Sequence, residues 1–333
     1  MGIIVTGSIA TDYLMVFPGR FVEQIVPDQL ANLSVSFLVE DLAIRRGGAA
    51  ANIAFNLGCL GLAPVLVGAV GADFAEYGHW LSAHGVDVSA VRISQTKHTA
   101  RFQCTTDTDQ NQIASFYAGA MSESRDIELT PIVDRVGGTD LVVVGPNDPA
   151  GMLRHTQECR DLGYPFAADP SQQLAALDGD QITQLVEGAA YLFTNTYERG
   201  LLEQKTGWSE EDVLARVGVS VLTRGAKGVT VARPGEPVIS VTPPQERVKA
   251  DPTGVGDAFR AGFLAGVQWG VGDERAAQLG CMLATLVIES VGTQEHTFDP
   301  ETFLGRFSEA YGPDSAAEVA DHLRACASTS LHR

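Results

Sequence analysis

The segment 251–259 has the residue types of a site that binds an anion and removes a proton. Gly254 and Gly256 flank Val255 directly before an apolar helical stretch, so consecutive backbone N–H groups can converge on an anion, which the helix dipole also favours. Asp257 follows, although a bound anion would repel a carboxylate there. Its position makes chemical sense for a base that takes the proton of an attacking hydroxyl while the N–H groups hold the transferred phosphoryl group. The same residues also fit an ordinary glycine-rich helix start capped by Asp257.

A regular alternation of short apolar strands and helices predicts the framework that positions this segment. The strands are expected at 3–6, 65–70, 141–144, 166–168, 191–194 and 219–223. The helices between and after them are expected at 49–60, 149–162, 258–269 and about 273–290, among others. This order favours an α/β fold in which a mostly parallel sheet carries helices on both faces.

Two segments interrupt this alternation and predict one small β subdomain on a single domain that spans residues 1–333. The runs 99–106 and 112–117 alternate in polarity around a polar turn, which is typical of a β-hairpin, whereas 11–46 is mixed and weakly periodic. We expect a lid formed by about 13–46 and 92–120. Its strands would leave unpaired edges in a monomer, so a homodimer formed through the lid is expected.

Composition limits the classes of partner. The 333 residues carry a formal net charge of -18, which repels nucleic acid and anionic membranes, and 45% of them are hydrophobic, enough for a sizeable core. The five cysteines are widely spaced and odd in number, unlike a disulfide framework or a zinc site, so a reducing, cytoplasmic location is expected. The seven histidines lack the spacing of metal ligands, and no apolar run is long enough to cross a membrane.

Four motifs in sequence order resemble those of the ribokinase (PfkB) family of carbohydrate kinases, and together they span most of the chain. The segment 251–257 resembles the family's D-T-x-G-A-G-D signature, with Pro252 and Val255 as small departures. Residues 47–52 resemble its G-G-x-x-x-N turn and helix, 195–198 its N-x-x-E motif, and 223–228 its T-x-G-x-x-G turn. The chain has no P-loop G-x-x-x-x-G-K-[ST] motif, and its opening strand and turn lack the dinucleotide-binding G-x-G-x-x-G fingerprint.

The resemblance implies a ribokinase-like α/β fold with a small β lid, and transfer of a phosphoryl group from ATP to an alcohol. Asp257 is implied as the catalytic base, with Gly254, Val255 and Gly256 in the anion hole. Glu198 would organise Mg²⁺ and the phosphates through water, and the resemblance is also compatible with a K⁺ effect. The ATP-binding residues that it implies are Asn195, Thr223, Arg224, Gly225, Ala226, Lys227, Gly228 and Gly256.

Asp12 and two phenylalanines of the hairpin bear on the acceptor. In this family an Asp just past the first strand, as Asp12 is, binds vicinal hydroxyls, and one carboxylate can accept hydrogen bonds from both hydroxyls of a cis-diol. Phe102 and Phe116, one on each hairpin strand, can pack on a flat base, which a free sugar does not offer, or else pack the lid against its neighbour or a second subunit.

Within the family, the chain most resembles bacterial adenosine kinases of the actinobacterial type, over nearly its whole length. The stretches that carry this resemblance are 5–12, 36–39, 98–102, 112–117 and 167–173. It implies an ATP-dependent kinase that converts adenosine to AMP in purine salvage, by in-line transfer to the 5′-hydroxyl. The implied substrate-binding residues are Ser8, Asp12, Gly48, Asn52, Phe102, Phe116, Gln172 and Gln173.

Three alternatives stay open. A nucleoside kinase that prefers inosine or guanosine is the nearest, and a ribokinase-like sugar kinase is the next. From another class, the chain could be a nucleoside-binding regulator built on a decayed kinase fold. The intact Asp257, Gly254 and Glu198 argue against decay, and turnover with ATP would separate an enzyme from a binding module.

Overall fold

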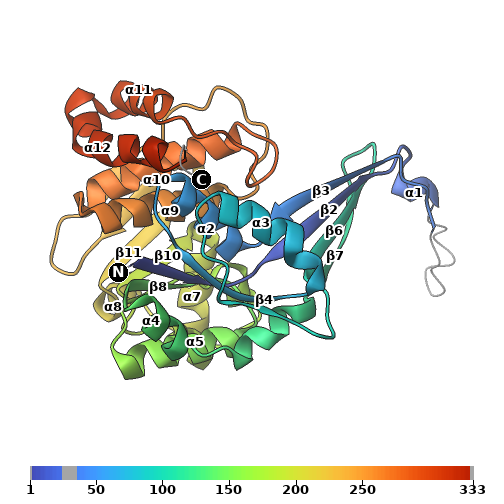
Figure 1. Ribbon diagram of the computed structural model, residues 1–333, viewed down its shortest axis with the longest axis horizontal. Helices are drawn as coiled ribbons and strands as arrows, with labels where there is room; N and C mark the ends of the chain where they lie inside the picture. The colour runs from blue at the N-terminus through green and yellow to red at the C-terminus, as the bar shows by residue number, and fades with distance from the viewer. Residues whose placement is uncertain (1, 25–35, 331–333) are drawn as a thin grey trace.

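A nine-stranded sheet forms the centre of the computed structural model, which describes residues 2–24 and 36–330 (Figure 1). From one edge to the other its strands are β13 (Ile239–Val241), β12 (Val229–Ala232), β11 (Val219–Thr223), β10 (Tyr191–Asn195), β9 (Phe166–Ala168), β8 (Thr139–Val144), β1 (Gly2–Thr6), β4 (Val65–Val70) and β5 (Val91–Ile93). The strands from β5 to β11 pair in parallel, and β12 and β13 add antiparallel strands at one edge. The predicted mostly parallel sheet is therefore confirmed.

The order of the strands reverses beside β1. The chain leaves β1 towards β4 and β5 on one side, and then returns to β8 and runs outward to β11 on the other. Such a reversal opens a crevice beyond the carboxyl ends of the strands, which is the usual ligand-binding place in an open α/β sheet. Backbone hydrogen bonds join β1 to its two neighbours up to this point. The Gly145 N–H, just after β8, donates to the Thr6 carbonyl over 2.8 Å, and the Gly7 N–H donates to the Val67 carbonyl of β4 over 3.1 Å.

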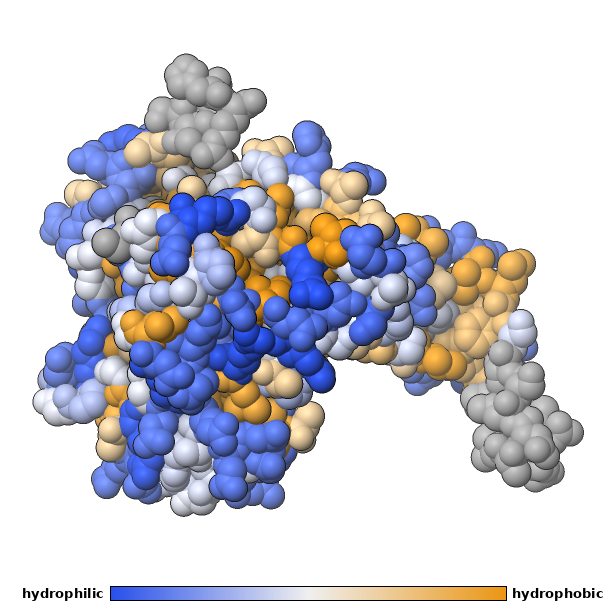
Figure 2. Space-filling view, turned by 60° about the horizontal axis from the view of Figure 1, so that its bottom comes forward, coloured by the Kyte–Doolittle hydropathy of each residue, from blue (hydrophilic) through white to orange (hydrophobic). Residues whose placement is uncertain are grey.

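A second sheet, here called the lid sheet, projects from one end of the molecule (Figure 1). Within the described residues its order is β3 (Asp41–Gly47), β2 (Ala10–Val16), β6 (Ala100–Thr106) and β7 (Gln112–Tyr117), so the predicted hairpin is confirmed as β6 and β7. Figure 2 shows hydrophobic residues gathered on the surface of this projecting part. Because β2 begins at Ala10, Asp12 lies inside a strand and not in a loop. The part of the predicted lid at 25–35 lies outside the described residues, and the division into domain and lid stays a prediction.

Helices cover both faces of the central sheet (Figure 1). One face carries α2 (Ala49–Cys59), α9 (Val255–Trp269) and α10 (Gly272–Ile288), with α3 (Ala75–Ala83), α11 (Pro300–Tyr311) and α12 (Pro313–Ser330) beside them. The other face carries α4 (Thr130–Val136), α5 (Pro149–Leu162), α6 (Gly179–Val186), α7 (Thr196–Thr206) and α8 (Glu210–Arg216). Short helical segments are α1 (Phe21–Gln24), η2 (Ala72–Phe74), η3 (Gly119–Asp126), η4 (Ser171–Ala175) and η5 (Gly225–Lys227).

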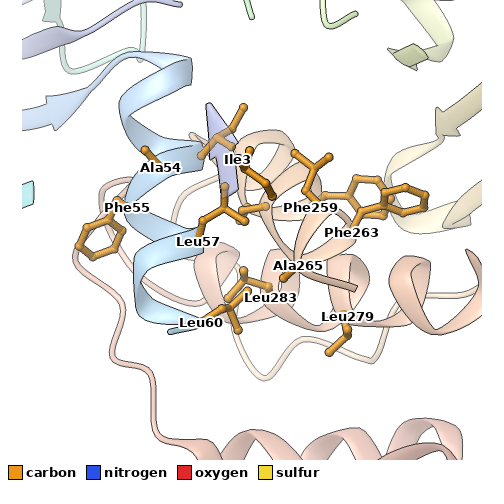
Figure 3. Packing of buried hydrophobic residues seen from close by; sticks show 14 of the residues in the cluster. Ile3, Ala54, Phe55, Leu57, Leu60, Phe259, Phe263, Ala265, Leu279 and Leu283 are labelled. Carbon is orange, nitrogen blue, oxygen red and sulfur yellow. The ribbon is translucent and has the colours of Figure 1, made fainter. Parts of the chain in front are cut away.

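Two buried clusters hold these layers together. Ile3 and Val5 of β1 join the core under α2, α9 and α10, whereas Ile4 joins the core on the opposite face, as expected for a strand that is buried on both sides. Figure 3 shows Leu57 of α2 in one cluster with Phe259 of α9, and Phe55 on the side of α2 that faces away from α9. The packing of α2 on α9 therefore fixes how their N-terminal ends meet. No helix of the described residues combines the length and apolar character needed to span a bilayer.

Candidate active site

The N-terminus of α9 presents three backbone N–H groups without acceptors in the helix. The helix begins at Val255, three residues before the predicted start, and Gly254 precedes it with φ +76°. The Ala258 N–H is the first to donate within the helix, to the Gly254 carbonyl over 2.9 Å. The N–H groups of Val255, Gly256 and Asp257 therefore lie together at the positive end of the helix dipole, where the anion hole is predicted.

Asn52 of α2 holds the Asp257 carboxylate by a hydrogen bond. Its Nδ2 donates to Asp257 Oδ2 over 2.8 Å, and its Oδ1 accepts from Thr293 Oγ1 and from Gln294 Nε2, both at 2.9 Å. Asn52 is buried, and the three partners fix which way its amide points. Two motifs that lie 205 residues apart in the chain thus meet at one hydrogen bond.

The start of α2 is fixed by the turn after β1. Gly48 has φ +93°, and a side chain there would stand 2.6 Å from the Ser8 carbonyl oxygen, so the turn requires glycine. The Ser8 hydroxyl oxygen accepts from the Ala49 N–H over 3.0 Å. Ser8 therefore caps α2 from a neighbouring segment, and this leaves its hydroxyl hydrogen for another acceptor.

Arg260, one turn after Asp257, brings a positive charge to the same place. Its Nε lies 2.6 Å from Asp169 Oδ2 and its Nη2 lies 4.0 Å from Glu198 Oε2, and all three side chains are buried. Burial raises the pKa of Asp257, while Arg260 and the hydrogen bond from Asn52 oppose that rise. Asp257 is thus a stronger base than a solvated carboxylate, as a proton acceptor requires.

Asp12, Phe102 and Phe116 share one face of the lid sheet. Asp12 pairs with Phe102 between β2 and β6, and Phe102 pairs with Phe116 between β6 and β7. The Asp12 carboxylate lies against Gly47, where an added side-chain carbon would stand 2.9 Å from Oδ2. Burial, together with the charge of Asp251, raises the pKa of Asp12 to about 6. The structure therefore brings the predicted diol-binding carboxylate and both aromatic rings to the same surface.

A cavity of about 340 Å³ opens beside Gly256, between η5, α9 and α10. Six of the predicted ATP-binding residues line it, namely Asn195, Thr223, Gly225, Ala226, Gly228 and Gly256. Its remaining wall is largely apolar and includes Val229, Phe259, Cys281, Ala284 and Ile288, none of which is among the predicted site residues. Arg224 and Lys227 lie in the same turn but are exposed and do not line the cavity.

Glu198 is built into the N-terminus of α7. Its Oε2 accepts from the Asn195 N–H over 2.8 Å, and Asn195 Oδ1 accepts from the Glu198 N–H over 2.9 Å, which is a reciprocal capping box. Its Oε1 lies 3.5 Å from Ser171 Oγ. The described residues contain no group of three or more metal-ligating side chains, so a divalent ion here would take its other ligands from phosphate and water.

The two glutamines of η4 differ in their surroundings. Gln172 is exposed, whereas the Nε2 of Gln173 donates to the Asn147 carbonyl oxygen over 2.8 Å. The amide of Gln173 is thus engaged in a hydrogen bond within the protein, whereas the amide of Gln172 is accessible to a ligand.

Sequence reasoning missed four residues that hold this site, Arg260, Asp169, Thr293 and Gln294. Arg260 had a visible signal, because it is the sole charged residue of the apolar stretch 258–269 and lies three positions after Asp257. Asp169, Thr293 and Gln294 act only through tertiary contacts and left no pattern in the sequence.

Comparisons with known proteins show which family the chain resembles. Residues 9–299 match the family described as pfkB family carbohydrate kinase. A nucleoside kinase of Methanothermobacter thermautotrophicus is 31% identical over 289 residues, which cover 86% of this chain and 92% of that protein.

Solved structures extend this likeness. A nucleoside kinase of Burkholderia thailandensis, solved in complex with inosine, is 35% identical and superposes with a TM-score of 0.81, over 93% of this chain and 98% of that one. A ribokinase of Arabidopsis thaliana complexed with ribose and ATP shares the fold, with a TM-score of 0.76 at 18% identity over 92% of this chain and 98% of that one.

The raised pKa of Asp12 predicts that Asp12→Asn stabilises the protein at neutral pH. The folded pKa of about 6 exceeds the ordinary value of 3.8, so the folded state binds this proton more tightly and loses stability as the pH rises through that window. Urea unfolding should show the variant more stable by about 1–3 kcal/mol at pH 7.5 and by about half as much at pH 5. The exposed Glu236→Gln is the matched control, expected to change little at either pH. A variant that is less stable than the wild type at pH 7.5 would contradict this account.

Proposed function

The chain belongs to the pfkB family of carbohydrate kinases, and from that premise we propose that it transfers the γ-phosphoryl group of ATP to the 5′-hydroxyl of a purine nucleoside. Adenosine is the acceptor we place first. The observation that carries the proposal is the hydrogen bond from Asn52 to Asp257, which holds a carboxylate of raised pKa beside three N–H groups that have no acceptor within α9.

In the proposed reaction the 5′-oxygen attacks the γ-phosphorus as the bond to the bridging oxygen of ADP breaks. Asp257 accepts the proton of the 5′-hydroxyl, so that AMP and ADP form when adenosine is the acceptor. The N–H groups of Val255, Gly256 and Asp257 stabilise the charge on the phosphoryl oxygens during transfer. Asn52 positions the carboxylate by fixing one of its oxygens, which leaves the other for the substrate proton.

The cavity beside Gly256 is the proposed ATP site. Its apolar wall suits an adenine ring, and Val255 and Gly256 line it at the N-terminus of α9, where the phosphates would lie. Glu198 and Asn195, at the carboxyl end of β10, would hold waters of a Mg²⁺ ion, which would neutralise phosphate charge when bound. Arg224 and Lys227 are exposed in the same turn as Gly225 and Ala226, which line the cavity, and their long side chains can reach towards the phosphates.

The lid sheet is proposed to bind the nucleoside. The Asp12 carboxylate would accept hydrogen bonds from both ribose hydroxyls, while Phe102 and Phe116 on the same face pack on the base. The exposed amide of Gln172 can either donate a hydrogen bond to a purine edge or accept one from it. Inosine is the second candidate acceptor, because the Burkholderia thailandensis relative was solved with inosine.

Replacing Asp257, the proposed catalytic base, should greatly reduce the rate of catalysis but leave nucleoside binding nearly unchanged. Asp257→Asn keeps the size of the side chain but removes its basicity, so we expect kcat to fall by about 10²–10⁴ while nucleoside affinity, measured by calorimetry, changes little. The control is Asp140→Asn, which removes an exposed carboxylate at the opposite, amino-terminal edge of the sheet. A variant at Asp257 that keeps most of its kcat would remove that residue from the proposed mechanism.

The acceptor is identified by release of ADP from MgATP with adenosine, inosine, guanosine, cytidine and ribose in parallel. We expect the highest kcat/KM with adenosine and very low turnover with ribose, which offers no flat ring to Phe102 and Phe116. A preference for inosine would keep the mechanism and revise the base contacts. Turnover with ribose alone would overturn the role of the lid phenylalanines, and no turnover with any acceptor would favour a nucleoside-binding regulator.

The face of the lid sheet opposite Asp12 supports the proposal of a homodimer. Leu42 and Ile44 of β3 and Ile113 and Tyr117 of β7 lie on that face by register, and each is about half exposed. Burying these side chains against a second copy would remove apolar surface from water and cover a sheet face in one step.

Light scattering at working concentration is expected to give twice the mass of one chain. Ile44→Glu places a charge on the apolar face and should yield a monomer, whereas Val238→Glu, at an equally exposed valine outside the lid, should stay dimeric. A monomeric wild type would contradict the dimer without affecting the proposed reaction.

A further inference from the structure

A second cavity, of about 560 Å³, lies behind α2 and is separate from both proposed substrate sites. Its walls include Phe55 and Cys59 of α2, Trp80 of α3, and His296 and Phe298 from the segment before α11. None of its lining residues belongs to the predicted nucleoside or ATP site. Phe55 points to this side of α2, away from the core that α2 forms with α9 (Figure 3).

His296 is the unexplained polar group of this cavity. It is only 7% exposed, and neither of its ring nitrogens has a hydrogen-bond partner among the described residues. Burial, with a contribution from the neighbouring His84, lowers the pKa of His296 to about 4, so the ring is neutral at physiological pH. A neutral imidazole offers one N–H donor and one acceptor nitrogen, and both are buried here without a protein partner.

The other walls suit a flat and uncharged ring. Phe55 stacks on Trp80 with their centroids 6.0 Å apart and 8° between the rings, and it meets His296 edge-on at 5.7 Å. Glu295 is the carboxylate among the described lining residues, and Arg46 pairs with it at 3.3 Å. The described His, Cys, Asp and Glu residues include no metal-binding cluster.

Three hydrogen bonds connect this cavity to the proposed base. Trp80 Nε1 donates to Gln294 Oε1 over 3.1 Å, and Gln294 Nε2 donates to Asn52 Oδ1 over 2.9 Å. Asn52 Nδ2 in turn donates to Asp257 over 2.8 Å. Gln294 Nε2 also lies 2.6 Å from the Tyr77 hydroxyl, which itself donates to the Gly47 carbonyl beside the turn that starts α2. These hydrogen bonds form a continuous chain from Trp80 to the Asp257 carboxylate.

We propose that this cavity is a second binding site, for an uncharged planar heteroaromatic molecule, and that its occupation changes the rate of phosphoryl transfer through Trp80, Gln294 and Asn52. His296 would bind the heteroatoms of the ligand, and Phe55, Trp80 and Phe298 would pack on its ring. The binding step stands on the cavity alone, whereas the change in rate rests on the proposed function of Asp257.

Benzimidazole is the probe, because it is flat and neutral at pH 7.5 and carries one N–H donor and one acceptor nitrogen. Calorimetry on the full chain, with saturating ADP and adenosine present, should give a Kd of about 1 mM or tighter. Indole, which lacks the acceptor nitrogen, should bind more weakly. No binding of benzimidazole up to its solubility limit would overturn the proposal.

Two variants assign the binding to this cavity. His296→Phe keeps a ring against Phe55 and removes both nitrogens, so benzimidazole affinity should fall by about ten-fold or more while thermal stability and basal kcat are kept. Thr297→Trp, at an exposed lining residue, blocks the cavity from its rim and should have the same effect without altering the core. Unchanged affinity in both variants would place benzimidazole elsewhere and refute the assignment.

Trp80→Phe separates binding from coupling. It keeps an aromatic wall but removes the N–H that donates to Gln294, so the variant should bind benzimidazole while losing its effect on kcat. In the wild type that effect should be about five-fold or more. Binding without any change in the wild-type kcat would overturn the coupling. A chain that phosphorylates no acceptor, yet binds benzimidazole in a His296-dependent manner, would refute the proposed function and leave the binding site standing.

Discussion

The hydrogen bond between Asn52 and Asp257 is the constraint on which the rest of the site depends. It requires two helices from distant parts of the chain to begin at the same point, with side-chain atoms 2.8 Å apart. The surrounding contacts fix the position of both helices. Gly48 and Ser8 set the start of α2, and Gly254 sets the start of α9. The apolar core that the two helices share keeps them from sliding past each other. An error in any of them would move the carboxylate relative to the N–H groups beside it, and a displacement of about 1 Å is enough to impair a positioned reaction.

The site has to attract phosphate although the molecule as a whole is strongly negative. A chain of net charge -18 does not attract a polyphosphate by its overall field, so the attraction has to be local. The N–H groups of α9 supply it, while the buried Arg260 offsets the charges of Asp169 and Glu198 beside it. Burial raises the pKa values of Asp12 and Asp257, so keeping these two carboxylates ionised costs folding free energy. Burying charged side chains in this way lowers the free energy of unfolding but provides the groups that the reaction needs, as is common at active sites.

The sequence predicts the parts of this site that are local and misses those that are tertiary. The glycines and Asp257 fall within seven residues, and the strands of the central sheet are buried on both faces, so each leaves a continuous pattern. β2 and β3 are only partly buried and give no clear period, which is why Asp12 was expected just past the first strand and not inside the lid sheet. Thr293 and Gln294 are uncharged, lie in a loop, and matter because the fold brings them to Asn52.

α2 has two roles that cannot be altered independently. Asn52 and Phe55 lie three residues apart on it, so one side of the helix orients the proposed base while the adjacent side forms a wall of the second cavity. Ser8 and Gln294 lie outside the helix, and both hold its first turn, at Ala49 and at Asn52. Pressure on Phe55 therefore cannot be absorbed by that side chain alone, since it is fully buried and its ring packs on Trp80 and His296. Any molecule that fills the cavity acts on the same helix that holds the carboxylate, and this is the physical reason to expect the two sites to be coupled.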